Sequence, residues 1–406
     1  MRGAASDMPL HCTTKRANGG LRLFRGRPET GGGKWRLGCM PWGELLESAR
    51  FRSLVIQRRR GGDSMKRAVL LAVAVLFQTL PLVCAEDLFE IKEVAPGVYA
   101  AIAKPQYKVN CNAAIVMLDD GLLLVDTHSK PSAARALIAQ IKTVTDKPVK
   151  YVVNTHFHWD HYQGNEAYPS SWPAGVEIIS SEATRENIVN RGIPRVKHEI
   201  TTMPKEIEGL KAELAKATDA KRKAELEENL RQAEEYLREL KMMQVTLPTM
   251  TFDRSLILHR KSRTVEILWL GRAHTEGDVF VFLPKERVIA SGDALHGWTP
   301  FMGDSYPYDW IQTLDKAERL DFAVAIGGHG DVMHGKATFE LWKQYFQDLM
   351  DETAAAFAGG ATLDDARRQV SAKLMAKYTG RFPDTFPKDV MANIEKAYRV
   401  VSGQTD

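Results

Sequence analysis

Short apolar runs and polar turns alternate along the chain from about residue 89. The runs over 89–103 and 113–125 predict strands, and Asp-Asp-Gly at 119–121 predicts the tight turn of a β-hairpin. Residues 131–143 instead place apolar side chains at helical spacing, and a buried strand is predicted over 149–154. This alternation of strands and helices favours an α/β layered fold.

The pattern of short strands resumes after residue 250 and gives way to helical spacing at Lys336. From Lys336 onward we expect a helical C-terminal extension, residues 336–406, with breaks at Gly359-Gly360 and over 379–388. The elements predicted before it are strands over 250–270, 279–283, 288–290 and 322–326 and a helix over 308–320.

A strongly charged stretch, residues 204–243, separates the two groups of strands, with 9 Lys and Arg and 10 Asp and Glu. Its leucines recur at three-and-four spacing, which predicts an amphipathic helix. The register breaks around 217–220, which favours two antiparallel helices over one continuous rod. We interpret this helical insert as a cover on the edge of the domain, or alternatively as a lid or an oligomer contact. Its balanced charges argue against membrane binding.

The densest group of polar side chains directly follows the strand predicted over 149–154. His156, His158, Asp160 and His161 lie within six residues of one another. Because extended residues two apart project to the same side, His156 and His158 can bind one metal ion together. Asp160 and His161 lie beyond the strand end and can point toward a second ion. Imidazole nitrogens with carboxylate oxygens suit zinc, although iron and manganese accept similar ligands.

Four more chemically distinctive residues each follow an apolar run, in the order Asp126, His274, Asp293 and His329. Together with the His-x-His-x-Asp-His stretch, this order of motifs resembles the signature of the metallo-β-lactamase superfamily over roughly residues 90–335. The resemblance implies an α/β fold of four layers, αββα, for a domain over residues 86–335. The helical hairpin and the helical C-terminal tail would be additions to that fold.

The resemblance also implies a role for each motif residue, in two groups of metal ligands that share a bridging carboxylate. The first group is His156, His158 and His274, the second is Asp160, His161 and His329, and the bridge is Asp293. Asp126 would orient the ligand loop without binding metal, because ligating histidines need their other nitrogen fixed. Asp160 would also act in catalysis, by orienting the nucleophile and moving its proton to the leaving group. The expected cofactors are two Zn²⁺ ions, with Fe or Mn as alternatives.

Other polar and aromatic residues near these motifs are weaker candidates for a substrate pocket. The structural alternative for each is a packed or merely exposed side chain. These candidates are His128, Trp159, His296, Trp298 and His334.

The front of the chain has a different character from the rest. Residues 1–64 carry 13 Lys and Arg against 5 Asp and Glu and little apolar periodicity, so we interpret them as a disordered or untranslated leader. Residues 65–85 have the basic start, apolar run and small-residue cleavage site of a signal peptide, which predicts a periplasmic or secreted protein. The apolar run is about half of the roughly 20 residues that a membrane span needs. The net charge of +4 is concentrated in the leader, so it does not indicate nucleic-acid binding.

Several activities share this scaffold, so the resemblance alone does not decide the reaction. His158 stands where the diiron flavoprotein branch has an acidic residue, and Asp293 is the bridging residue of glyoxalase II and lactonases. We therefore expect a zinc-dependent hydrolase that uses a metal-bridged hydroxide on an ester, thioester or lactone carbonyl of a small-molecule substrate.

Four alternatives stay open: a class B-like β-lactamase, sulfate ester chemistry, a persulfide dioxygenase and a non-catalytic binding protein. The mature protein could also form a homo-oligomer through the insert or the C-terminal helices.

Overall fold

The computed structural model describes residues 87–107, 109–383 and 385–404, which lie within one compact unit of the chain. The predicted leader, residues 1–64, and signal peptide, residues 65–85, lie outside the described residues. None of the helices in the described part combines the length and the apolarity needed to cross a membrane.

The first β-sheet has seven strands in the order of the sequence. Its first four strands form an antiparallel meander, and the hairpin predicted at 119–121 joins β3 to β4. From β4 to β7 the neighbouring strands are parallel. The strands are β1 (Phe89–Ala95), β2 (Val98–Ala103), β3 (Ala113–Met117), β4 (Leu122–Val125), β5 (Val149–Val153), β6 (Glu177–Ser181) and β7 (Met250–Phe252).

The second sheet has six strands in the order β13-β12-β11-β10-β9-β8. Only the β11–β12 pair is parallel among its described neighbours. The strands are β8 (Ser255–His259), β9 (Thr264–Leu268), β10 (Phe280–Leu283), β11 (Val288–Gly292), β12 (Val324–Gly327) and β13 (Met333–His334).

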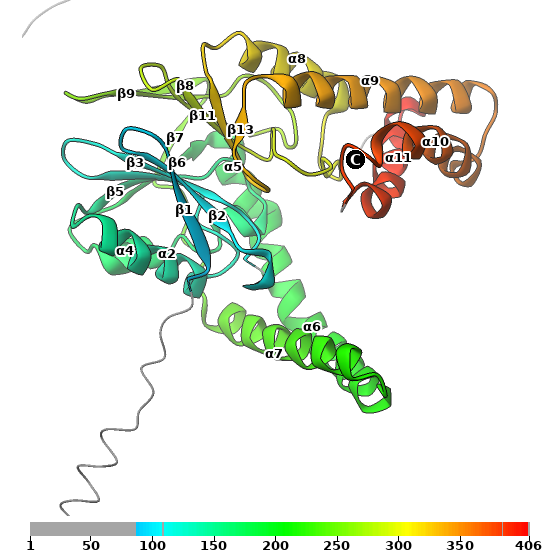
Figure 1. The fold of residues 1–406 in the computed structure, drawn as a ribbon, viewed down its shortest axis with the longest axis horizontal. Coiled ribbons are helices and arrows are strands. Elements are labelled where there is room, and N and C mark those ends of the chain that lie inside the picture. Colours follow the sequence, from blue (N-terminus) through cyan, green and yellow to red (C-terminus); the bar gives the residue numbers. More distant parts are fainter. Residues whose placement is uncertain (1–86, 108, 384, 405–406) are drawn as a thin grey trace, which may run out of the picture. The chain divides into compact units, whose positions relative to one another are not determined.

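The two sheets pack face to face, with helices on their outer faces (Figure 1). Val116 and Val153 from the first sheet share one buried apolar cluster with Ile267 and Val281 from the second. The outer face of the first sheet is covered by α2 (Pro131–Val144) and α4 (Ala167–Ser171), and that of the second by α8 (Pro307–Glu318) and α9 (Ala337–Ala358). The predicted four-layer αββα fold is confirmed.

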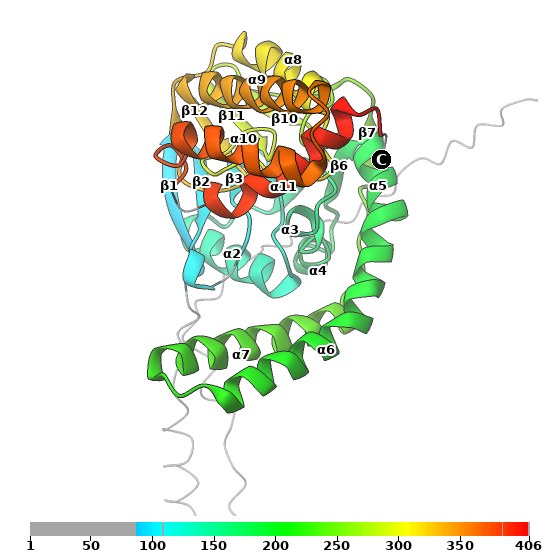
Figure 2. The ribbon, with the colours of Figure 1, turned by 90° about the vertical axis from the view of Figure 1, so that its right-hand side faces the viewer.

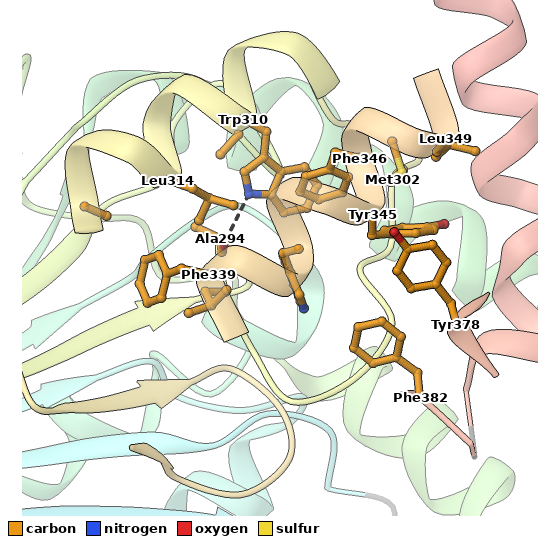
Figure 3. Close-up of a cluster of buried hydrophobic side chains, with 14 of the residues drawn as sticks. Ala294, Met302, Trp310, Leu314, Phe339, Tyr345, Phe346, Leu349, Tyr378 and Phe382 are labelled. Carbon is orange, nitrogen blue, oxygen red and sulfur yellow. Dashed lines mark hydrogen bonds between the residues drawn. The ribbon is translucent and has the colours of Figure 1, made fainter. Parts of the chain in front are cut away.

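The C-terminal helices pack on this domain through an aromatic cluster around Trp310 (Figure 3). Trp310 Nε1 donates a hydrogen bond to the carbonyl of Ala294 at 2.9 Å, and its ring lies 4.6 Å from that of Phe346. Tyr378 and Phe386 extend the cluster into α10 (Leu363–Tyr378) and α11 (Phe386–Val401). The helices end where the breaks were predicted, and the tail completes the core of its own chain.

The charged insert forms the predicted pair of antiparallel helices, α6 (Ile193–Lys216) and α7 (Ala220–Met242) (Figure 2). The first helix begins eleven residues before the expected start at 204, directly after α5 (Glu182–Asn187) and a π-helical turn (Ile188–Gly192). Pro204 lies inside α6. Proline usually marks a helix boundary, but Met203 and Ile207 on either side are buried against α7, and this packing keeps the helix continuous.

Candidate metal centre

The predicted metal ligands lie on loops that leave strands of both sheets. The loop after β5 carries His156 and His158 and continues into the short helix α3 (Trp159–Tyr162), which holds Asp160 and His161. The second sheet contributes His274 after β9, Asp293 after β11 and His329 after β12. Rigid strands thus deliver ligand-bearing loops to one place.

The structure brings all seven predicted ligands together, and we call them the His/Asp cluster. Their candidate ligand atoms form three overlapping groups, within each of which all atoms lie within 4.8 Å of one another. The groups are His156, His158 and His274; His156, His161 and Asp293; and Asp160, His161 and His329. These groups could hold metal ions.

Asp293 lies between the two expected ligand groups. Its Oδ2 is 3.1 Å from His329 Nε2 and 3.7 Å from His274 Nε2, while its Oδ1 is 3.4 Å from His161 Nε2. A Cβ on Gly328 would come within 2.0 Å of Asp293 Oδ1, so only glycine fits beside this carboxylate. The carboxylate therefore has the position that a bridging ligand needs.

Three buried ligand atoms at the centre have no hydrogen-bond partner among the described residues. They are His156 Nε2, His161 Nε2 and Asp293 Oδ1. Buried polar atoms are normally satisfied, because leaving one unpaired costs about 1–3 kcal/mol. The opposite nitrogens of the two imidazoles have partners: His156 Nδ1 faces Thr155 Oγ1 at 3.1 Å, and His161 Nδ1 lies 2.8 Å from Asp126 Oδ2. The residues present therefore fit a group of bound cations.

Asp126 has the contacts that an orienting residue requires. Its Oδ2 accepts a hydrogen bond from His161, and its Oδ1 accepts one from the backbone N–H of Thr155 at 2.8 Å. Asp126 also has a positive φ of 65°, and the buried His128 two residues later has a φ of 71°. Aspartate adopts this conformation more readily than most residues, and here it turns the loop toward the ligands.

The other histidines are also fixed through the nitrogen that faces away from the centre. His274 Nδ1 lies 3.0 Å from the carbonyl of Phe301, and His329 Nδ1 lies 2.8 Å from the carbonyl of Asn110. Such partners fix the tautomer and the ring orientation of ligating histidines. Each ring can thus present its free lone pair inward.

His158 is held by Asp304, a residue that the sequence analysis missed. Asp304 Oδ2 lies 2.8 Å from His158 Nε2, and its other oxygen accepts a hydrogen bond from Arg191. This leaves His158 Nδ1 facing His274 Nε2 at 2.8 Å. Arg191 lies in the π-helical turn, and such turns are frequent at functional sites.

The charges of the cluster are strongly perturbed. Burial lowers the pKa of His156 and His274 well below the usual value, and neighbouring histidines add to this effect, so both rings are neutral. Burial opposes ionisation of Asp293, but His329 and His161 hold its pKa well below its usual range. Neutral His156 and His274 beside an ionised Asp293 have the protonation states that metal binding requires. Burial would also lower the pKa of His161 and of His329, but the charges of neighbouring acidic groups outweigh burial and raise the pKa of both, so a bound cation would displace a proton from these two rings.

The candidate pocket residues differ in how exposed they are and in whether they lie beside the His/Asp cluster. Trp298 is 40% exposed and stacks on the ring of His329 at 4.9 Å, so it lies beside the cluster. His296 and His128 are buried, and burial lowers the pKa of each to about 3, which favours a packing role. The structure does not bring His334 to the cluster: it is exposed and pairs with Val324 at the start of β12, whereas His329 follows the end of that strand.

Trp159, the remaining pocket candidate, lies between the cluster and the helical insert. Its ring centroid is 5.8 Å from that of Tyr236 on α7, and the guanidinium of Arg195 on α6 lies 5.4 Å from the indole. The residue directly after His158 thus contacts both helices of the hairpin.

The fold and the His/Asp cluster define an αββα protein with a candidate two-metal site. Residues 107–188 match the family model of the metallo-beta-lactamase superfamily. The chain is similar to that superfamily over this segment, which includes Asp126 and the stretch from His156 to His161.

Two alkylsulfatases are among the similar proteins. A linear primary-alkylsulfatase from Pseudomonas sp. (strain ATCC 19151) is 26% identical over 265 residues, which cover 62% of this chain and 48% of that protein. The chain thus spans about half the length of this curated relative. The solved structure of the stereoselective inverting sec-alkylsulfatase Pisa1 from Pseudomonas sp. is 18% identical with a TM-score of 0.56, over 77% of this chain and 50% of that one. A metallo-beta-lactamase from Pontibacter korlensis is also 18% identical with a TM-score of 0.47, over 64% of this chain and 99% of that one.

Proposed function

We propose that this protein is a hydrolase that holds two zinc ions in the His/Asp cluster and cleaves sulfate ester bonds. The metal-binding part of this proposal rests on one observation. His156, His161 and Asp293 each place a buried atom without a hydrogen-bond partner in the same small group of candidate ligands. The substrate class is supported by the two alkylsulfatases, one similar in sequence and one similar in fold. We therefore propose a sulfate ester as the substrate, in place of the carbonyl ester that the sequence motifs alone favoured.

When bound, the two cations supply a water-derived nucleophile at neutral pH and a Lewis acid for the ester oxygens. The protein fixes the ligand geometry through Asp126, Asp304 and the backbone carbonyls behind each histidine. Asp160 is the proposed proton carrier. Its Oδ2 lies 3.6 Å from His329 Nε2 and 3.8 Å from His161 Nε2, and its side chain is 10% exposed, so it faces both the cluster and solvent. A group in this position can hold the proton of the attacking water and pass it to the leaving alcohol.

The test uses purified protein with its metal content measured by elemental mass spectrometry. We expect about two zinc ions per chain and release of sulfate from octyl sulfate, with little turnover of octyl acetate or of a chromogenic cephalosporin. Cleavage of the acetate without the sulfate would overturn the substrate class. A protein that holds two zinc ions and cleaves none of the three would overturn the proposal as a whole, and a single iron would replace the two-zinc site with a mononuclear one.

The variant Asp160→Asn separates proton transfer from folding. We expect it to lose at least about a hundredfold in kcat, within the usual range for a positioned acid or base. Its zinc content is measured beside its activity, because Asp160 is also a proposed ligand. Full activity in this variant would contradict the assigned role.

A further inference from the structure

A cavity of about 250 Å³ lies between α7 and the loops that carry the His/Asp cluster. Its walls include Trp159, Ala233 and Tyr236, and its polar lining includes Asn110, Ser129 and Lys130. We call this space the α7 cavity. The superfamily's sandwich supplies one side of it, and the helical insert supplies the other.

Three segments that line the α7 cavity are next to residues of the cluster or of the loop that orients it. Trp159 lies between the proposed ligands His158 and Asp160 in the sequence. The carbonyl of Asn110 accepts the hydrogen bond of His329. Ser129 and Lys130 follow the loop in which Asp126 holds His161. A substrate bound at the metals can therefore extend into this cavity.

The α7 wall is fixed to the domain by polar contacts at its C-terminal half. Glu239 accepts hydrogen bonds from the backbone N–H and the hydroxyl of Ser132, at 2.9 and 2.6 Å, at the start of α2. The hydroxyl of Tyr236 donates to Gln163 Oε1 at 2.9 Å, directly after α3. These contacts favour a preformed wall over a mobile lid, and preformed pockets are the usual form of small-molecule sites.

The chemistry of the lining suits an anionic amphiphile. The faces of Trp159 and Tyr236 and the methyl group of Ala233 offer apolar surface for a hydrocarbon chain. The Lys130 ammonium makes no hydrogen bond or ion pair with any residue of the described part of the chain, so its charge is available to an anion. A neutral, polar substrate would use neither feature.

We propose that the α7 cavity is the substrate subsite that binds the alkyl chain of the sulfate ester, with Lys130 attracting the anionic group. This inference rests on the proposed function and assigns a role to the helical insert: α7 determines how long a chain the enzyme accepts. The insert is then part of the binding site as well as a cover.

The first test fills the cavity with Ala233→Trp and uses Ala224→Trp as the matched control. Ala224 is exposed and lies nine residues earlier on α7, two and a half turns away, so it points to the opposite face. Each methylene buried in an apolar site tightens binding about fourfold. In wild type and Ala224→Trp we expect KM for alkyl sulfates to fall with each added carbon from butyl to octyl. In Ala233→Trp we expect this dependence to flatten, so that KM for octyl sulfate rises at least about tenfold relative to Ala224→Trp.

A second measurement does not depend on turnover. Binding of octyl and butyl sulfonate, which lack the scissile ester oxygen and are not hydrolysed, is measured by calorimetry on the zinc-loaded protein below the micelle concentration. We expect the octyl compound to bind at least about tenfold tighter in wild type and Ala224→Trp but not in Ala233→Trp. Lys130→Gln adds no volume and should weaken binding of the sulfonate, but not of octanol, relative to the exposed-lysine control Lys221→Gln.

The outcomes separate this inference from the proposed function. Chain-length-dependent sulfonate binding without any sulfate ester turnover would support the subsite and overturn the sulfatase. Turnover that responds equally to chain length in wild type and in Ala233→Trp would overturn the subsite and leave the sulfatase in place. If Ala233→Trp fails to fold, the comparison of Lys130→Gln with Lys221→Gln decides: equal sulfonate binding by these two variants would overturn the role of the cavity.

Discussion

Replacing Asp304 with Asn should weaken metal binding although Asp304 is not itself a proposed ligand. Its carboxylate lies 2.8 Å from His158 Nε2 and is also bound by Arg191. Burial opposes the charge of Asp304, but His158 and Arg191 hold its pKa far below the usual range, so an ionised carboxylate supports the ring. Ligating histidines are more basic when their second nitrogen donates to a carboxylate.

The magnitude follows from what asparagine retains. Loss of an outer partner of a metal ligand typically lowers metal affinity by about 10–100-fold, or about 1.4–2.7 kcal/mol. Asparagine keeps one oxygen that can accept from His158 Nε2 but loses the negative charge. We therefore expect zinc affinity to fall about tenfold in Asp304→Asn and about a hundredfold in Asp304→Ala.

The assay is a competition for zinc between the protein and a chromophoric chelator at fixed pH. Asp309→Asn is the matched control, because Asp309 also pairs with an arginine, Arg272, and its carboxylate has no other hydrogen-bond or ion-pair partner in the described part of the chain. Zinc affinity in Asp304→Asn that equals that of the control would refute the reasoning. A loss of affinity in Asp304→Ala alone would show that the hydrogen bond matters and the charge does not.

Three further outcomes are expected. Gly328→Ala should lower the zinc content of folded protein below two per chain, because its Cβ would come within 2.0 Å of Asp293 Oδ1; elemental analysis that still finds two would contradict the tight fit. His156→Ala should remove the candidate ligand whose Nε2 is buried without a partner and lower both zinc content and activity, and full activity would argue against the two-metal site. The exported product should begin near Glu86, and mass spectrometry of the intact protein that finds residues 1–85 attached would contradict the predicted signal peptide.

The sequence predicted what is encoded locally. The ligand stretch from His156 to His161 could be recognised because four side chains of metal-ligating types lie within six residues, directly after an apolar strand. The break between α6 and α7 could be placed because the apolar register changes at 217–220. Both features depend on residues that are close together in the chain.

What could not be predicted depends on contacts between distant residues. Asp304 lies 146 residues after His158 in a loop without periodicity, so nothing in the sequence pairs them. The helix through Pro204 is maintained by apolar packing against α7, which overrides the local preference of proline. The contact of Trp159 with Tyr236 needs the docked hairpin, and Trp159 therefore could not be placed beforehand.

The distribution of the ligands over two sheets gives the proposed metal ions a second role, as cross-links. His156 leaves the first sheet and His329 the second, and the 172 residues between them would form a loop closed at the metal centre. Closing a loop of this length in the unfolded chain has an entropic cost comparable to that of a disulfide, on the order of 5 kcal/mol. Cys111 is the only cysteine in the described residues, so the described part cannot form a disulfide within itself. The zinc ions would thus join the two halves of the sandwich in the way that a disulfide joins two segments of other proteins, and the supply of zinc would affect how long the folded protein persists.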